Sequence, residues 1–437
     1  MLIGMRKKLS GKRIRVVHNR LAAVVGAVAL GLMAIVFARM GEVAQALFNH
    51  LVLISPFPPF AVTPLVFAGV AYITRRSFPA ASGSGIPQVM AAGHNPERHK
   101  SDDLISLKTA WAKLAGTIAM LLAGGSVGRE GPTVQISAAL MVAVHRWLRV
   151  PVTSGVIIAG GAAGVAAAFN TPLAGVAFAI EELAAAFEQK VAVLVMLAVM
   201  ISGLVSLGLA GDYVYFGALD SGLPLRTMII VAPIAGIFGG LLGGAFSRSL
   251  IAMTRPRHPW LMLIKSRPVL LAGICGLVVA VTGWTSNGLS WGTGYETTRQ
   301  LLIGHSASMT FGPAKFASTL ATALSGAPGG IFAPSLSVGA GMGQLISSLF
   351  PQSSAGAIVL LGMVGYFTGV VRAPMTSVII MMEMTADRTM ILPLFATALI
   401  ADAVSSNICK DKLYHALSRQ YLKPATAHDL APPQKED

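Results

Sequence analysis

Residues 124–132 read Gly124-Gly125-Ser126-Val127-Gly128-Arg129-Glu130-Gly131-Pro132, and an apolar run follows directly. Proline at the start of such a run is typical of a helix N-terminus, because the N–H that proline lacks has no partner there. The segment therefore predicts a glycine-rich loop that leads into a helix. The first turn of a helix presents free N–H groups and a partial positive charge, which favour an anion. Glu130 places a carboxylate in that same turn.

A second copy of this segment lies 202 positions further along the chain, as Gly326-Ala327-Pro328-Gly329-Gly330-Ile331-Phe332-Ala333-Pro334. The same offset, without a gap, pairs three more positions: Pro172 with Pro374, Val176 with Val378, and Glu181 with Glu383. A weaker match at an offset of 209 sets Gly83-Ser84-Gly85 beside Gly292-Thr293-Gly294. We therefore expect two homologous halves, at residues 21–215 and 225–423, between a basic segment at 1–20 and a tail at 424–437.

The composition indicates a membrane protein. Of the 437 residues, 54% are hydrophobic and 12% are charged, whereas about 25% of the residues of a soluble domain are charged. Three apolar stretches approach the ~20 residues that a spanning helix needs, namely 21–39, 190–211 and 227–246. Others are short and interrupted by Gly and Pro: 110–125, 133–146, 156–169, 173–180, 332–349 and 375–384. Broken apolar helices in matching positions of two halves point to a transport site.

The net charge of +15 is concentrated at the two ends of the chain. Basic residues cluster before the first apolar stretch and again near the C-terminus: Arg6, Lys7, Lys8, Lys12, Arg13, Arg15 and Arg20, then Lys410, Lys412, Arg419 and Lys423. By the positive-inside rule, both termini are expected in the cytoplasm. Nucleic acid is not an expected partner, because no folded basic domain carries this charge. No cleavage site follows the first basic run, so a signal peptide is not expected.

The residues that enzymes and metal sites use are scarce or scattered. Cys275 and Cys409 lie far apart and predict neither a disulfide framework nor a metal site. None of the 9 histidines forms a metal cluster or a nucleophile–base pair. We therefore expect no enzyme, no metal and no cofactor. The glycines of Gly239-Gly240 and Gly243-Gly244 are expected to pack helices together.

Three glycine-rich segments each lead into an apolar run, and together they carry a family resemblance. They are Gly83-Ser84-Gly85-Ile86-Pro87, Gly128-Arg129-Glu130-Gly131-Pro132 and Gly329-Gly330-Ile331-Phe332-Ala333-Pro334. Three converging helix N-termini would hold a chloride ion without any full positive charge. In residue pattern and order, these segments resemble the signatures of the CLC family of chloride channels and chloride/proton exchangers. The resemblance covers about residues 80–423, and Ala167–Gly175 and the Glu181-Glu182 pair also fit it.

The resemblance implies an all-α polytopic membrane protein of the bacterial type, built as an inverted repeat of tilted, broken and re-entrant helices. It implies a homodimer in the bacterial inner membrane, with one pathway for chloride and protons in each subunit. Because 23 residues follow Tyr414 in the 437-residue chain, no C-terminal regulatory domain is expected.

The resemblance also assigns roles to individual residues. Ser84 and Tyr414 resemble the residues whose hydroxyls contact the central chloride, and the amides of Ile331 and Phe332 resemble its backbone donors. Glu130 resembles the gating glutamate. Glu182 resembles the internal proton glutamate of exchangers, and we expect it at the cytoplasmic end of a helix, near water. The supporting positions are Gly83, Gly85, Pro87, Gly128, Arg129, Gly131, Pro132, Gly330 and Pro334.

Plainer interpretations exist for several of these positions. Glu130 is also placed to complement a helix dipole, Ser84 to cap a helix, and Tyr414 to anchor at the membrane interface. Arg129 fits either an electrostatic helper of the site or a partner of a buried acid.

Neighbouring positions also have plain interpretations. Glu181, whose repeat mate is Glu383, suggests a structural role such as bonding backbone in each half. Gln88 stands where many family members have an acid and is expected to matter little. His415 is expected to be a cytoplasmic surface residue.

Among functions, a chloride/proton antiporter is the leading hypothesis. A passive chloride channel is the alternative, which Glu182 disfavours because channels of this family generally lack an acid there. Fluoride- and nitrate-selective members usually carry another residue in place of Ser84, proline in the nitrate case. A cation or amino-acid symporter would also show broken helices and a repeat, but it would not need three glycine-lined helix N-termini.

Overall fold

The computed structural model describes residues 2–94, 103–183, 189–211, 214–219, 222–254 and 259–422, so that Lys423 and the tail 424–437 lie outside it. The described chain is helical almost throughout. The first half contains α1 (Leu2–Ile54), α2 (Pro59–Ser77), η1 (Pro79–Ala81), α3 (Ile86–His94), η2 (Asp103–Ile105), α4 (Leu107–Leu122), α5 (Glu130–Trp147), α6 (Ser154–Phe169), α7 (Pro172–Phe178), the π-helical turn η3 (Ala179–Leu183) and α8 (Gln189–Ala210).

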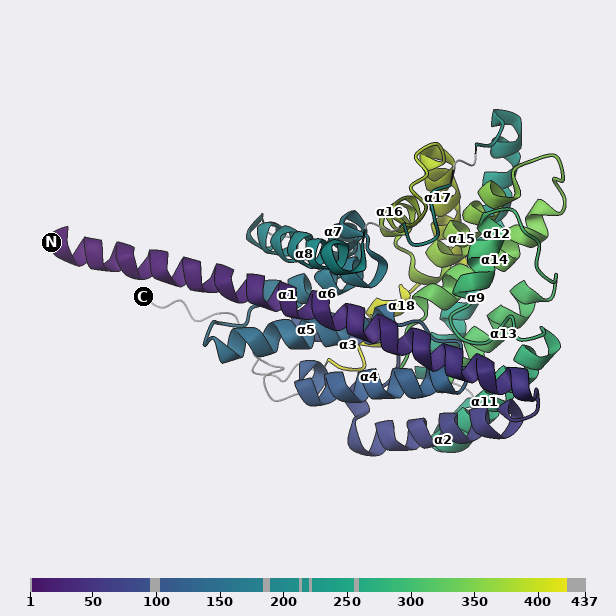
Figure 1. The fold of residues 1–437 in the computed structure, drawn as a ribbon, viewed down its shortest axis with the longest axis horizontal. Helices are drawn as coiled ribbons and strands as arrows, with labels where there is room; N and C mark the ends of the chain where they lie inside the picture. The colour runs from purple at the N-terminus through teal and green to yellow at the C-terminus, as the bar shows by residue number, and fades with distance from the viewer. Residues whose placement is uncertain are drawn as a thin grey trace.

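The second half contains α9 (Leu225–Thr254), α10 (Pro259–Ser266), α11 (Pro268–Thr285), α12 (Tyr295–Leu302), α13 (Phe311–Leu324), α14 (Phe332–Ser347), α15 (Ala355–Val371), α16 (Pro374–Thr385), α17 (Ile391–Ile408) and α18 (Leu413–Ser418). In Figure 1, α5 to α8 lie on one side and α12 to α17 on the other, and the long α1 runs across the molecule.

Five of the described helices are long and apolar enough to cross a membrane: His18–Ile54, Val191–Leu209, Leu225–Thr254, Pro268–Thr285 and Ile391–Ile408. They include the three spans expected from the sequence. The remaining apolar helices are shorter, as the Gly and Pro interruptions predicted; α6 and α15 are examples. The prediction of an all-α, multi-pass membrane protein is confirmed.

The repeat is visible in the helix boundaries. The offset of 202 carries the first residue of α5 onto that of α14, and the first residue of α7 onto that of α16. The last residue of α4 falls on that of α13, and the last residue of α6 falls on that of α15. The offset of 209 carries Ile86, which begins α3, onto Tyr295, which begins α12. Helices that start and stop inside the protein thus occur as matched pairs.

Two glutamates join the halves reciprocally. The Glu181 carboxylate accepts hydrogen bonds from the amides of Met375 and Thr376, at 3.2 and 2.7 Å. The Glu383 carboxylate accepts the equivalent bonds from Leu173 and Ala174, at 3.0 and 2.7 Å. Each acid therefore satisfies first-turn N–H groups of the short helix in the other half, α16 or α7. The backbone role expected of this pair is confirmed.

Glycines allow α9 to approach α15 and α17 closely. A Cβ at Gly239 would overlap the carbonyl carbon of Gly365, and one at Gly243 would overlap that of Gly369. On the neighbouring face, a Cβ at Gly240 would lie 2.6 Å from the Ala401 carbonyl oxygen. These contacts confirm the packing role expected of the glycine cluster. Cys275 and Cys409 are buried free thiols.

Replacing Gly239 with alanine should destabilise the fold, because the added methyl group meets backbone of α15 that has no space to move aside. We expect Gly239→Ala to lower the free energy of unfolding by about 1–3 kcal/mol, measured by thermal unfolding in detergent. Gly69→Ala in α2 is the matched control, since nothing lies within 4 Å of a Cβ there. Equal melting temperatures for the two variants would contradict the packing account.

Candidate anion pathway

The glycine-rich loops of the two halves are hydrogen-bonded to each other. Gly128 and Gly330, which are repeat mates, exchange N–H···O bonds of 2.8 Å in both directions. The Gly83 amide donates to the Gly326 carbonyl at 3.4 Å. The repeat mates of those two residues make the same bond, from the Gly292 amide to the Gly124 carbonyl at 3.2 Å. The loops are therefore arranged with approximate twofold symmetry about the Gly128–Gly330 pair.

Two buried lysines hold these loops from the side. Lys113 in α4 donates to the carbonyls of Ser82 and Gly83, at 3.2 and 2.8 Å. Its repeat mate, Lys315 in α13, donates to the carbonyls of Ser290 and Gly292, at 3.1 and 2.6 Å. Both side chains are fully buried. We did not single out either lysine in the sequence, although a lone lysine at the same repeat position in two apolar runs is a readable signal.

The first turns of α3, α5 and α14 follow directly from these loops, at Ile86, Glu130 and Phe332. The first N–H groups of each helix have no intrahelical partner. Gly131 brings the start of α5 against Ser84, because a Cβ there would overlap the Ser84 hydroxyl. The predicted convergence of three helix N-termini is thus present in the structure.

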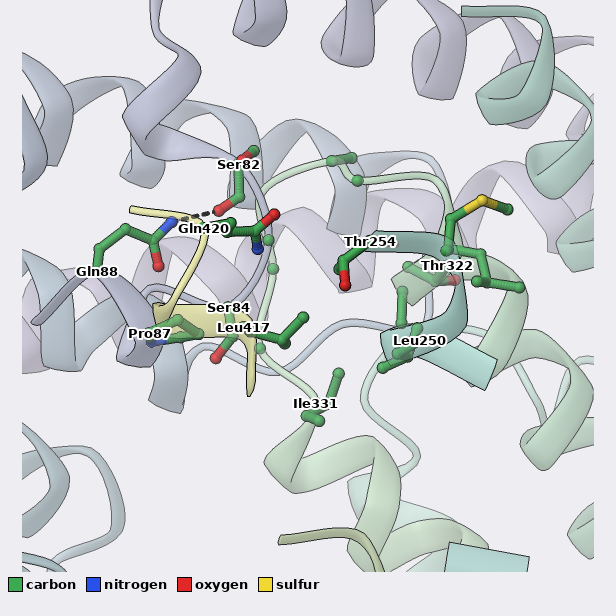
Figure 2. A pocket seen from close by; sticks show the side chains of 18 of the residues that line it. Ser82, Ser84, Pro87, Gln88, Leu250, Thr254, Thr322, Ile331, Leu417 and Gln420 are labelled. Atoms are coloured by element: carbon green, nitrogen blue, oxygen red, sulfur yellow. Dashed lines mark hydrogen bonds between the residues drawn. The ribbon is translucent and has the colours of Figure 1, made fainter. Parts of the chain in front are cut away.

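Ser84 and Tyr414 line a cavity of about 510 Å³ together with Ile331. Their hydroxyls face each other, and both are buried without a hydrogen bond of normal geometry in the described chain. Figure 2 shows Ser84 and Ile331 in this cavity. Buried hydroxyls usually have a partner. Two hydroxyls left open beside a helix N-terminus are suited to donate to an anion.

The Glu130 carboxylate is turned toward the start of α14. Its Oε2 accepts a long hydrogen bond of 3.4 Å from the Ala333 amide, while its Oε1 has no partner in the described chain. The residue is 1% exposed. The carboxylate therefore occupies a place at a helix N-terminus that an anion would also favour.

The Phe332 side chain fixes the first turn of α14. Its ring lies against four others, with centroid distances of 6.1 Å to Phe169, 6.0 Å to Phe178, 4.8 Å to Phe367 and 6.1 Å to Tyr414. These rings come from α6, α7, α15 and α18. The cluster positions both the α14 amides and the tyrosine that faces Ser84.

Arg129, the residue before Glu130, lines a second cavity of about 480 Å³ together with Gln45 and Thr293. Its Nη1 donates to the Ala38 carbonyl at 2.9 Å and to Glu42 at 3.4 Å, both in α1. Val127 lines the first cavity and Arg129 lines the second. The chain thus passes from one cavity to the other directly before Glu130.

A family model described as "Voltage gated chloride channel" matches residues 65–406. The chain belongs to this family. Its structure is similar to that of a slow cyanobacterial Cl⁻/H⁺ antiporter, with a TM-score of 0.76 and 24% identity over 92% of this chain and 98% of that one.

Two further CLC structures share the fold. A CLC-type fluoride/proton antiporter has a TM-score of 0.77 and 22% identity, over 92% of this chain and 98% of that one. A eukaryotic CLC transporter has a TM-score of 0.76 and 19% identity, over 93% of this chain and 74% of that one. The CLC fold predicted from the three glycine-rich segments is confirmed.

One residue of this CLC chain does more than we expected. Gln88 donates from Nε2 to the Ala80 carbonyl at 3.2 Å, to the Ser82 carbonyl at 2.7 Å and to the Tyr421 hydroxyl at 3.1 Å. Figure 2 shows the bond to Ser82. A carboxylate has no hydrogen to donate to these carbonyls. The amide therefore braces the loop before Ser84, while the expectation that Gln88 matters little for transport stays a prediction.

The structure also bears on the expectations for Arg129 and Glu182. Arg129 forms an ion pair with Glu42, whose side chain is 55% exposed. The Arg129 charge also acts on Glu130. The expectation that Glu182 lies near water was wrong, because Glu182 is only 2% exposed. It follows α7 in the η3 turn, which α6 and α3 cover.

Gly131→Ala tests whether the contact between the α5 terminus and Ser84 shapes an anion site. The added methyl group would displace the Ser84 hydroxyl, so we expect chloride affinity to fall about tenfold, a loss of about 1.4 kcal/mol. Isothermal titration calorimetry with chloride measures this directly. Gly93→Ala is the control, since its Cβ would lie at an ordinary 3.6 Å from Ile158. Unchanged affinity in a folded Gly131→Ala protein would remove this contact from the site.

Proposed function

We propose that this protein is a chloride/proton antiporter that exchanges chloride for protons across the membrane. The proposal rests on the position of Glu130. Its carboxylate accepts a hydrogen bond from an amide of α14, at a place suited to an anion. A group that competes with the transported anion, and that a proton can neutralise, provides a means of coupling the two ions.

The chloride site would lie between the Ser84 and Tyr414 hydroxyls and the first amides of α14. Each is a neutral donor, so their attraction for chloride is spread over several dipoles. Such a site replaces part of the hydration shell of the ion and still allows it to leave. Ile331 and Phe332 supply the α14 amides in this account. No cofactor is required, because the chemistry is limited to ion binding and proton transfer.

The coupling follows from the charge of Glu130. When ionised, its carboxylate holds the α14 terminus and excludes chloride. When protonated, it loses most of its attraction for the N–H dipoles, and chloride can replace it. Each cycle of displacement and return would carry a proton one way and chloride the other.

Glu182 is the proposed internal proton acceptor. Its repeat mate is Met384, so this acid is present in only one half of an otherwise matched scaffold. A passive channel would need no second acid away from the anion path, and Glu182 therefore favours the antiporter over that alternative. Proton movement through Glu182 also avoids the crowded region between Ser84 and Tyr414.

We further propose that two copies form a homodimer in a bacterial inner membrane, with both termini in the cytoplasm. Apolar side chains of α7, α8 and α17 are exposed in the single chain: Leu173, Met196, Met200, Leu204, Leu392 and Leu399. Each copy contains all the residues assigned to the pathway, which agrees with one pathway in each subunit.

Glu130→Gln tests the gate. The amide imitates the protonated acid and cannot release a proton, so chloride should still move while coupled proton uptake disappears. Chloride flux should also lose its dependence on external pH. The measurement is simultaneous chloride and proton flux from liposomes, with Glu296→Gln, an exposed acid at the second cavity, as the control. A Glu130→Gln protein that still drives protons uphill would exclude Glu130 from coupling.

Ser84→Pro tests the choice of anion. Proline removes one hydroxyl donor and reshapes the loop that Gln88 and Lys113 brace. We expect the ratio of chloride affinity to nitrate affinity to fall at least about tenfold, which equals about 1.4 kcal/mol, in competitive binding calorimetry. The same titration with fluoride on the wild-type protein compares the two halides. Unchanged selectivity in Ser84→Pro would count against Ser84 as a ligand. Preferential binding of fluoride by the wild-type protein would identify fluoride, and not chloride, as the substrate.

A further inference from the structure

The proposed transport cycle does not explain how the buried Glu182 exchanges protons with water. Its carboxylate is buried, and neither oxygen has a hydrogen-bond partner in the described chain. An acid that loads and unloads protons needs contact with water or with another group that has such contact. The neighbouring Glu181 does not supply it, because both of its oxygens are bonded to the amides that begin α16.

His415 lies beside this acid and is far more exposed than it. Its Nε2 is 4.0 Å from Glu182 Oε2, and its side chain is 43% exposed, whereas that of Glu182 is 1% exposed. The residue is in the short helix α18, directly after Tyr414. A single, partly exposed imidazole therefore lies beside the buried carboxylate, and its ring has a second nitrogen that can exchange a proton.

We propose that His415 passes protons between water and Glu182, an inference that rests on the antiport function proposed above. Nδ1 takes a proton from the aqueous phase, and the ring becomes an imidazolium. Nε2–H then gives its proton to Glu182 Oε2, which leaves the neutral ring with its hydrogen on Nδ1. The starting tautomer is restored when Nδ1 releases its hydrogen to water and Nε2 takes up another proton, or when the ring flips. The 4.0 Å separation is closed by a small rotation of the ring or by one bridging water.

The surroundings of His415 suit this task. The charged groups acting on it are Lys412 and Arg419 from its own segment and Glu182 from η3. Helices α3, α9 and α15 pack against α18, and among the described residues none of them forms an ion pair with the His415 ring. Burial, with the charges of Lys412 and Arg419, lowers the pKa of His415 below its ordinary value. The ring is therefore largely neutral near pH 7 and is free to accept a proton.

Tyr414 and His415 are adjacent residues of α18, and their side chains face different groups. The Tyr414 ring packs on Phe332 and its hydroxyl faces Ser84, so that residue belongs to the anion path. His415 faces Glu182. The proton route through His415 and the anion route past Tyr414 thus begin at neighbouring side chains but remain separate.

The experiment compares His415→Gln with wild type in liposomes, with both fluxes recorded over internal pH values from about 5 to about 8. Glutamine keeps a polar side chain but does not titrate. Near neutral pH, we expect proton flux to fall at least about tenfold, with chloride flux falling less, so that more chloride moves per proton. The difference should narrow at acidic pH, where the higher proton concentration in water loads Glu182 directly.

Control variants and a binding measurement separate proton transfer from a structural effect. His305→Gln changes an exposed histidine in the loop after α12 and should leave both fluxes unchanged. Chloride titration calorimetry on His415→Gln should give the wild-type affinity, because His415 is not among the residues that line the cavity of Ser84 and Tyr414. Glu182→Gln should abolish proton flux at every pH, and adding His415→Gln to it should change nothing further.

The outcomes distinguish this inference from the function on which it rests. If the wild-type protein shows no coupled proton flux, the antiport proposal fails and this inference fails with it. If the wild type couples and His415→Gln couples equally well at all pH values, antiport stands and the role of His415 is overturned. A defect that is the same at every pH, or that comes with lost chloride affinity, would also overturn it, since a structural role predicts that pattern.

Discussion

Unpaired backbone N–H groups at the starts of α3, α5 and α14 are the constraint on which the rest of the structure depends. Three helix N-termini that point toward one region repel one another through their partial charges, and inside a membrane no bulk water satisfies their amides. The loops before them are therefore bonded to each other, through Gly128 with Gly330 and Gly83 with Gly326. An anion, or the Glu130 carboxylate, completes what the backbone leaves open.

The residues that support the loops and helix ends occur in both halves of the repeat, whereas the groups assigned to ion transport do not. Lys113 and Lys315 brace equivalent loops, and Glu181 and Glu383 cap equivalent helices. At three other mated positions the halves differ: Ser84 against Thr293, Glu130 against Phe332, and Glu182 against Met384. In each pair, the first half holds the group assigned to ion transport. The second half contributes the amides of α14 and an aromatic anchor, so the pathway needs both halves.

Most of the fold could be predicted because glycine, proline and apolar residues report directly on helix ends. The offset of 202 positions identified the matched broken helices, and the Glu181 and Glu383 pair followed from it. Contacts between distant segments could not be predicted in this way. The interaction of Gln88 with Tyr421 spans 333 positions, and the burial of Glu182 depends on how α3 and α6 cover the η3 turn. The sequence predicts a surface position for His415, and its ring is indeed partly exposed. Its proximity to Glu182 could not be predicted, because the two residues are far apart in the chain.

Antiport is the central claim, and it is tested most directly by the wild-type protein in liposomes with a chloride gradient and no initial pH difference. In an antiporter, chloride moving down its gradient drives protons in the opposite direction, so we expect a pH difference to develop across the liposome membrane. The pH change should be abolished when chloride is replaced by an impermeant anion. Chloride movement without any proton movement, in a protein that binds and transports chloride normally, would contradict the account and identify a passive chloride pathway.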